Sequence, residues 1–522
     1  MKRFCLTGFL LLICTLNLSA SVDQNPLSVG TTQARNVNGK ACEAPTNNPA
    51  LLGVERVPKC GLILPLFNTG IGAWSDKLAL SPFNPAIYPV GNFWADSVSK
   101  GAALLSRILR RSFDLEGLTP DEVSDKLTEE FAGGLKMYAG AKSTLLSLAW
   151  NRIAFDITTH YDEQVNVPDG PLFVLFSRDK GLLKGNTLDF SNFSQDIIWA
   201  TDFTFHIGLP VNIPVLHDLF KLRFGAGGIG IKYVMGHSIL KGNTETGVLS
   251  YNENTNSLDV DATMKIQTAG TGYTGPWRSS NIFENGLPVN GHGIGVEIGG
   301  ILYDENSALT INVQNLGVLF WINKVKEVTY RIKKNGLDVY DIISGIDKAN
   351  ADSTDPLLTI FNRNENEFVS DENDTLKDAN GFATILPLSF NIGYSYSLDF
   401  AESKPKLRPL ADYLNLSVSY QQQFDHGPGR SPIPRFAFGA EAGALYGVLP
   451  VRLGYVLGGS ERLASAVGVG INIKDHVSLN ASYKAVGSPI FIPKRGMELA
   501  GGLNINWGTS LDSDKDGICD KF

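Results

Sequence analysis

The end of the chain carries the oxygen-rich side chains of a metal site. Acidic residues recur at alternate positions in the pattern D-x-D-x-D-G-x-x-D, in which Gly517 allows a sharp turn. Hard oxygen ligands that converge around such a turn suit Ca²⁺. The predicted ligands are Asp512, Asp514, Asp516, the backbone carbonyl of Ile518, and Asp520. The alternative is a solvated acidic tail, because the pattern occurs once and at the chain terminus.

A glycine-rich motif has the spacing of a dinucleotide site but not its context. Gly225, Gly227 and Gly230 satisfy the pattern G-x-G-x-x-G. A dinucleotide site needs a helix to follow, since the pyrophosphate binds at the helix N-terminus. Residues 231–234 are Ile, Lys, Tyr and Val, which favour a strand. We expect these glycines to let a strand bend or approach a plug closely.

Motifs for hydrolytic catalysis do not occur in the sequence. The chain has no G-x-S-x-G and no H-E-x-x-H, and its seven histidines are scattered without ligand spacing. Several charged or titratable residues stand on what the strand pattern makes the inner face: Arg152, Asp156, Asp202, His206, Glu297, Glu441 and Arg452. The inside of a wet barrel is ordinarily polar, so we interpret these residues as lumen lining. An enzyme is not expected.

Two cysteines are candidates for a disulfide. Cys42 and Cys60 are near enough in sequence to close a short loop. In an oxidising compartment they could form a bridge, and two free thiols are the alternative. Cys519 would be left over.

The elements that must position these residues are strands with two unlike faces. Over 388–400, apolar side chains alternate without a break with Ser, Asn, Gly and Asp, which is the period of a strand. The alternation recurs over 414–421, 436–446, 467–483 and 499–507. A two-residue turn at 475–476 separates two such runs, as in an antiparallel hairpin. The pattern predicts an up-and-down antiparallel sheet.

The polar face favours a membrane barrel over a soluble β-sandwich. A sandwich turns that face to bulk water and carries Lys, Glu, Arg and Thr there, whereas this chain has mostly Ser, Asn, Gly and Gln. Small neutral residues suit the interior of a closed barrel. Trp199, Trp321 and Trp507 are expected in aromatic girdles at the membrane interface. The predicted fold class is all-β: an antiparallel up-and-down transmembrane β-barrel of about 14 strands, roughly 12–16, with an N-terminal helical plug or cap.

The N-terminus has the layout of a secretory signal peptide. Lys2 and Arg3 precede an apolar run over 4–16 and small residues at 19–21. Removal of residues 1–20 takes both positive charges away and changes the net charge from −8 to −10, which disfavours a nucleic-acid partner. The sequence contains no stretch apolar enough for a membrane helix, so we expect entry into the outer membrane of a Gram-negative bacterium as a barrel.

The remaining segments are a polar lead-in or plug over 21–60, the barrel over 61–507 and the Asp-rich tail over 508–522. Apolar residues at helical spacing predict a helical insert over about 95–146, which would either plug the lumen or cap one end of the barrel. Two polar stretches without sustained alternation, about 237–291 and 335–383, are predicted to be extracellular loops, with room for short hairpins of their own.

Short segments resemble known outer-membrane barrels. Asn48–Gly53, N-P-A-L-L-G, resembles a segment before the first strand of the long-chain fatty acid transporters. Gly291–Tyr303, followed by Leu309–Gly317 and Trp321, is similar to segments of the TraF-like and PorV/PorQ-like barrels, with Glu297 where Asp is more usual. The resemblance implies a 14-stranded barrel with an N-terminal plug and traffic of hydrophobic molecules. The Asp-rich tail resembles thrombospondin type 3 Ca²⁺ repeats.

Three functions are compatible with the sequence. The first is passive transport of hydrophobic or small solutes through a plugged barrel, with membrane lipid and a small ligand as partners. The second is a scaffold or shuttle for surface proteins, which the PorV-like resemblance implies and in which the long loops would bind the partner. The third is a secreted soluble β-protein.

Overall fold

The computed structural model describes residues 23, 25–31, 47–54, 60–64, 68–78, 126, 129–131, 133–169, 187–189, 191–212, 220–252, 257–270, 289–338, 377–400, 411–473 and 476–507. Residues 1–20, Cys42, residues 95–125 and the Asp-rich tail lie outside this part of the chain. Within it, none of the helices combines the length and the hydrophobicity needed to span a bilayer.

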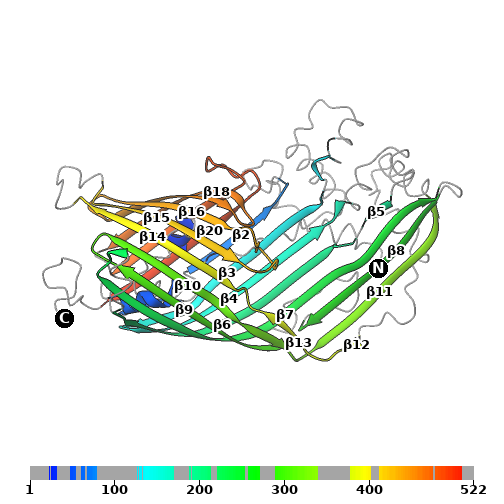
Figure 1. Ribbon diagram of the computed structural model, residues 1–522, viewed down its shortest axis with the longest axis horizontal. Coiled ribbons are helices and arrows are strands. Elements are labelled where there is room, and N and C mark those ends of the chain that lie inside the picture. The colour runs from blue at the N-terminus through cyan, green and yellow to red at the C-terminus, as the bar shows by residue number, and fades with distance from the viewer. Residues whose placement is uncertain are drawn as a thin grey trace, which may run out of the picture.

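Antiparallel strands close into a 14-stranded barrel, as predicted (Figure 1). The first half of the wall consists of β1 (Cys60–Ile63) with β2 (Asn68–Ser75), β3 (Leu135–Trp150), β4 (Ile153–Val167), β6 (Ser194–Pro210), β7 (Phe224–Asn252), β9 (Gly291–Tyr303) and β10 (Ser307–Trp321). The second half consists of β13 (Phe382–Ile385) with β14 (Ser389–Asp399), β15 (Tyr413–Gln423), β16 (Arg435–Ala444), β17 (Leu449–Gly458), β18 (Arg462–Ile473), β19 (Val477–Val486) and β20 (Gly496–Trp507).

Two of these wall strands are interrupted, and the first of them closes the ring. β1 and β2 both pair with β3 on one side and with β20 on the other, so together they form one strand. β13 and β14 both pair with β10 and form the eighth strand in the same way. Closure leaves the wall without a free edge, which is what a barrel in lipid requires.

Alternation along each wall strand separates an apolar outside from a polar inside. In β9, Ile294 and Ile298 are 59% and 51% exposed, whereas Glu297 between them is 6% exposed. β14 repeats the pattern, because Ile392 and Tyr394 point outward and Asn391 is buried inside. The arrangement is inverted relative to a soluble protein, in which large apolar side chains are buried.

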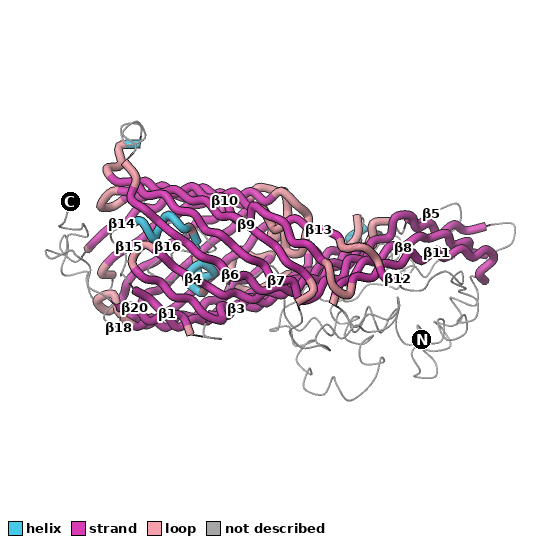
Figure 2. Tube along the Cα trace, turned by 90° about the horizontal axis from the view of Figure 1, so that it is seen from below, coloured by secondary structure: helices cyan, strands magenta, loops and turns pink. Residues whose placement is uncertain are grey.

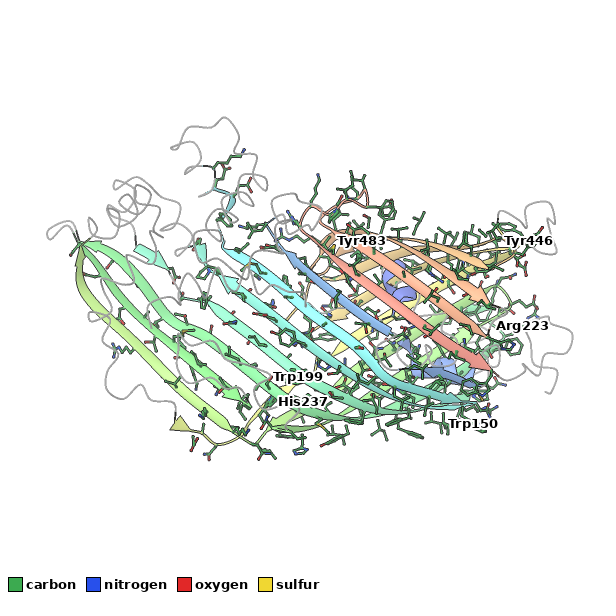
Figure 3. All side chains as sticks on the ribbon, turned by 180° about the vertical axis from the view of Figure 1, so that it is seen from behind. Trp150, Trp199, Arg223, His237, Tyr446 and Tyr483 are labelled. Carbon is green, nitrogen blue, oxygen red and sulfur yellow. The ribbon has the colours of Figure 1, made fainter. Side chains whose placement is uncertain are left out.

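The two ends of the barrel differ. At one end the connections are short, such as 151–152 between β3 and β4, 304–306 between β9 and β10, and 445–448 between β16 and β17. Figure 3 shows Trp150 and Tyr446 at this end, and both side chains are exposed. β14 to β20 have 10 to 12 residues each. Tilted by about 45°, such strands rise about 23–28 Å, which matches the apolar band of a membrane barrel.

An arm of β-sheet extends from the other end (Figures 1 and 2). β7 has 29 residues, or about 95 Å at about 3.3 Å per residue, and only its first part lies in the wall. Its second part pairs with β8 (Ser257–Ala269), which pairs with β11 (Val325–Asp338). Short β5 (Thr187–Asp189) and β12 (Lys377–Asp378) flank the arm.

The arm leaves the wall at a β-bulge. Along β6, Trp199 pairs with Ser238 but Ala200 pairs with Gly236, so His237 is the extra residue. Pairing of β7 with β9 ends at Gly236, and pairing of β7 with β8 begins at Ile239. Figure 3 shows Trp199 and His237 side by side at this branch.

The N-terminal segment lies inside the barrel, as two short helices seen in Figure 2. α2 (Pro26–Gly30) contacts β17 to β20, and the 3-10 helix η2 (Pro49–Gly53) contacts β6, β7 and β9. The buried residues Ala50, Leu51 and Leu52 form an apolar cluster with residues of the surrounding wall. This segment is the plug, and it fills the end of the barrel with the short connections.

Several predicted elements differ from the structure. Residues 135–146 of the predicted helical insert belong to strand β3, in which Lys142 lines the cavity inside the barrel. The predicted loop over 237–291 contains the end of β7 and all of β8, and the predicted loop over 335–383 begins within β11. Polar residues alternate less visibly on an arm that projects beyond the apolar band, so the sequence pattern missed these strands.

Candidate functional site

Two groups of ionisable side chains line the lumen. The first, the His206 cluster, lies on β4, β6, β7 and β9. His206 Nε2 is 2.7 Å from Asp156 Oδ1. Lys232 Nζ lies 3.1 Å from Asp202 Oδ2 and 2.9 Å from Glu297 Oε1. Each cation is thus paired with an acid from a neighbouring strand, which ties the wall together across four strands.

The second group, the Lys484 cluster, lies on β16 to β20. Arg452 Nε donates to Glu441 Oε2 at 2.5 Å and Arg452 Nη1 donates to Asn480 Oδ1 at 3.0 Å. Lys484 forms ion pairs with Glu461 and Glu498. The backbone amide of Asp23 donates to Glu498 at 2.9 Å and connects this cluster to the plug segment.

Glu461 lies in the turn between β17 and β18. Its carboxylate accepts from Arg435 Nε at 2.8 Å and from Lys484 Nζ at 2.6 Å. Burial of Glu461 raises its pKa, but attraction to Arg435 and Lys484 outweighs burial and lowers the pKa to about 2.

The inner-face residues of the sequence analysis occupy these clusters with one exception. Asp156, Asp202, His206, Glu297, Glu441 and Arg452 are buried side chains inside the barrel. Arg152 lies in the two-residue turn between β3 and β4, where its carbonyl accepts from the amide of Gly208. It is therefore not part of a wall strand. The predicted inner-face residues did not include five further members of the clusters: Lys232, Arg435, Glu461, Lys484 and Glu498. A lone charge within an apolar alternation is the sequence signal for Lys232 and Lys484.

A cavity of about 200 Å³ lies in the lumen between the His206 cluster and β13 to β15. One part of its wall is apolar and includes Val234, Leu319 and Leu386. The rest is polar, with amide side chains, including Asn391 and Gln421, and charged groups of both signs. Such a mixture can bind a small solute by hydrogen bonds and charge on one side and by apolar contact on the other.

Glycines of the wall form the seat of the plug. The Asn48 side chain accepts from the Ala50 amide at 3.0 Å and donates to the Gly300 carbonyl at 3.3 Å. A Cβ at Gly228 would lie closer than 3.0 Å to backbone atoms of Pro49 and Ala50. Gly208 and Gly299 are equally tight against the plug. The wall therefore accepts the plug only where side chains are missing.

The glycine motif of the sequence analysis has two functions in the structure. Gly230 makes room for His206, since a Cβ there would lie 2.7 Å from Nδ1 of that ring. Gly228, which lies between the motif glycines, contacts the plug, whereas a Cβ at Gly227 would meet only a Val211 methyl at 3.4 Å. The residues that follow the motif belong to strand β7, as expected. The close approach of wall and plug occurs at Gly228, one residue after the motif residue Gly227.

The three tryptophans are not equivalent. Trp507 is exposed on the outside of β20. Trp321 is 0% exposed and packs with Leu319, Val325 and Leu386 at the base of the arm, where its Nε1 donates to Thr384 at 3.1 Å. The prediction of a girdle position for Trp321 was therefore wrong, because the arm adds a packed layer at that height. Trp199 is partly exposed and lies 4.6 Å from the His237 ring, centroid to centroid.

The remaining candidate residues are not brought into a site. Cys60 is a free thiol at the start of β1, and Cys42 lies outside the described residues. The tail ligands Asp512, Asp514, Asp516, Ile518 and Asp520 also lie outside them, so Ca²⁺ binding there stays a prediction. In the part of the chain that the structure describes, no three His, Cys, Asp or Glu residues are grouped to hold a metal ion.

A comparison with family models assigns the chain to a protein family. Residues 108–433 match a family described as "Family of unknown function (DUF5723)", and this match takes in more than half of the chain. The chain belongs to this family. The DUF5723 match includes β3 to β15, and so the arm and most of the cavity wall.

Comparisons with curated proteins and solved structures are less informative. No curated protein matches the chain. The chain is similar to a Pseudomonas aeruginosa FadL homologue at 12% identity and a TM-score of 0.44, covering 94% of this chain and 100% of that one. It is also similar to the P. putida toluene transporter TodX at 8% identity and a TM-score of 0.37, covering 93% and 99% of the two chains. At such low similarity, function has to be inferred from the chain's own geometry.

Proposed function

We propose that this chain is an outer-membrane β-barrel of a Gram-negative bacterium whose lumen passes small solutes passively. The observation that carries the proposal is the inverted wall, apolar outside and charged inside. Large aliphatic and aromatic side chains facing water over a whole barrel would be unfavourable, at about 25 cal/mol per Å². Lipid removes this cost, and the strand lengths fit an apolar band of about 25 Å.

Passage requires both an internal site and a plug that can leave its seat. The cavity lies above the plug, on the side of the arm, where a solute entering from that end would be held. Below it, η2 and its apolar cluster obstruct the lumen. Within the described part of the chain, η2 contacts the wall through its apolar cluster and through the Asn48–Gly300 hydrogen bond, whereas a wall strand is held by a ladder of backbone hydrogen bonds. Displacement of η2 therefore breaks fewer hydrogen bonds than removal of a wall strand. We infer that solutes bind in the cavity first and pass when the plug moves.

Membrane fractionation followed by reconstitution tests this proposal. Expressed with its signal peptide, the chain should fractionate with outer membranes and migrate faster on a gel when unheated, as closed barrels do. Proteoliposomes that contain the purified chain should release small solutes faster than empty liposomes. A chain that fractionates without detergent would be a soluble β-protein, and the proposal would be wrong.

The arm favours a second candidate function, a scaffold for surface proteins. It projects from the rim and presents a polar surface with ion pairs, such as Lys265 with Glu327 at 3.0 Å. Hydrogen bonds from Gln267 and Lys265 lower the pKa of Glu327, which keeps this carboxylate ionised. Pull-down from intact outer membranes distinguishes the candidates: stoichiometric surface partners support the scaffold, and solute release without such partners supports transport.

A further inference from the structure

Two of the charged side chains that line the cavity in the lumen form no close ion pair within the described part of the chain. Lys142 on β3 and Asp162 on β4 both line it. Among the described residues, neither side chain forms a close ion pair or a hydrogen bond, whereas Lys232 in the neighbouring His206 cluster is paired with Asp202 and Glu297. The register pairs Lys142 with His160 and Gly140 with Asp162. Lys142 and Asp162 are therefore diagonal neighbours on adjacent strands, offset by two residues.

The carboxylate of Asp202 is a third charged group at the cavity. Asp202 is 9% exposed and lines the same cavity. Its Oδ2 accepts Lys232 at 3.1 Å, whereas its Oδ1 has no hydrogen-bond partner within the described part of the chain. The ring nitrogen Nδ1 of His160 is 4.0 Å from Oδ1, which is too far for a hydrogen bond. A buried carboxylate oxygen without a donor is unfavourable by about 1–3 kcal/mol, and a ligand donor in the cavity would satisfy it.

We propose that this cavity binds zwitterionic solutes, namely free amino acids and short peptides. The ligand carboxylate binds Lys142, and the ligand ammonium group binds between Asp162 and the free oxygen of Asp202. Asn391 and Gln421 on the facing strands supply donors and acceptors for an amide bond. This inference rests on the proposed transport function and names the class of solute.

Charge and volume both favour a zwitterion over a fatty acid. A fatty acid would leave Asp162 and Asp202 without a donor and would bring a second anion close to them, which is repulsive. The apolar part of the wall is small, and about 200 Å³ has space for a compact solute rather than a long chain. A neutral solute would leave the Lys142 charge unused.

Binding and permeation with matched probes test the inference. The probes are Ala-Ala, N-acetylalanine amide of similar size without charges, and palmitate. With the purified full chain in detergent, calorimetry should show that Ala-Ala binds at least about tenfold more tightly than the neutral amide, because a hydrogen bond to a charged group contributes about 1.5–3 kcal/mol. In proteoliposomes, Ala-Ala should permeate faster than the amide.

The variants Lys142→Met and Asp162→Asn should each reduce the preference for Ala-Ala about tenfold or more. The matched controls Lys241→Met on the arm and Asp189→Asn on β5 keep the same chemical changes away from the cavity and should retain it. Equal binding of Ala-Ala and the amide, preference for palmitate, or unchanged selectivity in both cavity variants would overturn the inference while leaving transport intact. Binding of Ala-Ala without release of any solute would instead overturn the transport function.

Discussion

The fit between Gly228 and the plug leads to a sharp prediction for Gly228→Ala. The added Cβ would lie closer than 3.0 Å to backbone atoms of Pro49 and Ala50, a separation that Cβ atoms essentially never show. Neither partner is a flexible side chain, so the plug has to move or the wall has to deform. Overpacking of this kind costs about 1–3 kcal/mol. If the plug moves, the cost shifts the balance between seated and displaced plug about 5- to 150-fold.

Single-channel conductance in planar bilayers measures that balance directly. Gly228→Ala should raise the ratio of open to closed channels about 5- to 150-fold over that of the wild type. Gly227→Ala is the matched control on the adjacent residue, because its Cβ would meet only Val211 at an ordinary 3.4 Å. Protease access to the N-terminal segment should rise in parallel. Equal conductance in the two variants and the wild type would show that the plug is not the gate or does not occupy this seat.

Three further perturbations test the wall. Arg452→Ala removes the buried cation that pairs with Glu441 and should lower the free energy of unfolding in detergent by about 3–5 kcal/mol. Arg223→Ala, which breaks exposed pairs, should change it by less than about 1 kcal/mol. Ile298→Lys on the outer face should destabilise the membrane-inserted barrel by about 2–4 kcal/mol, whereas Val248→Lys on the arm should not. Equal effects of the two substitutions on membrane assembly would contradict contact of Ile298 with lipid. The lowered pKa of Glu461 stabilises the fold above about pH 4.5, and this contribution disappears as the pH falls through about 2. Thermal unfolding of Glu461→Gln should therefore depend less on acid than that of the wild type.

The position of the solute site relative to the plug has a functional consequence. The plug is anchored on both sides of the barrel, through the Asp23 amide to Glu498 and through the carbonyl of Asn47, which accepts from Asn312 at 2.5 Å. Asp23 and Asn47 also line the cavity. A solute in the cavity therefore contacts the plug segment, so solute binding and plug position are coupled. Binding favours plug release only if the solute binds more tightly when the plug is displaced.

The strands of the second half of the barrel were predictable from the sequence for a physical reason. A strand between lipid and a wet lumen alternates strictly, and β14 coincides with the predicted run over 388–400 within one residue at each end. The alternation in β9 also predicted that Glu297 lies inside the barrel, but it did not identify Lys232 as its partner. The arm was not predictable in this way, because β8 and β11 project beyond the apolar band and neither face has to be uniformly apolar.

The sequence by itself determined the fold class and the inner and outer faces of the wall, because both depend on local alternation. Only the tertiary structure decided which charges meet and which do not. Lys232 finds its acids on β6 and β9, while Lys142 and Asp162 at the cavity have no close ion pair among the residues that the structure describes. Pairing across strands depends on register and on the bulge at His237, and these arise from the closure of the whole ring.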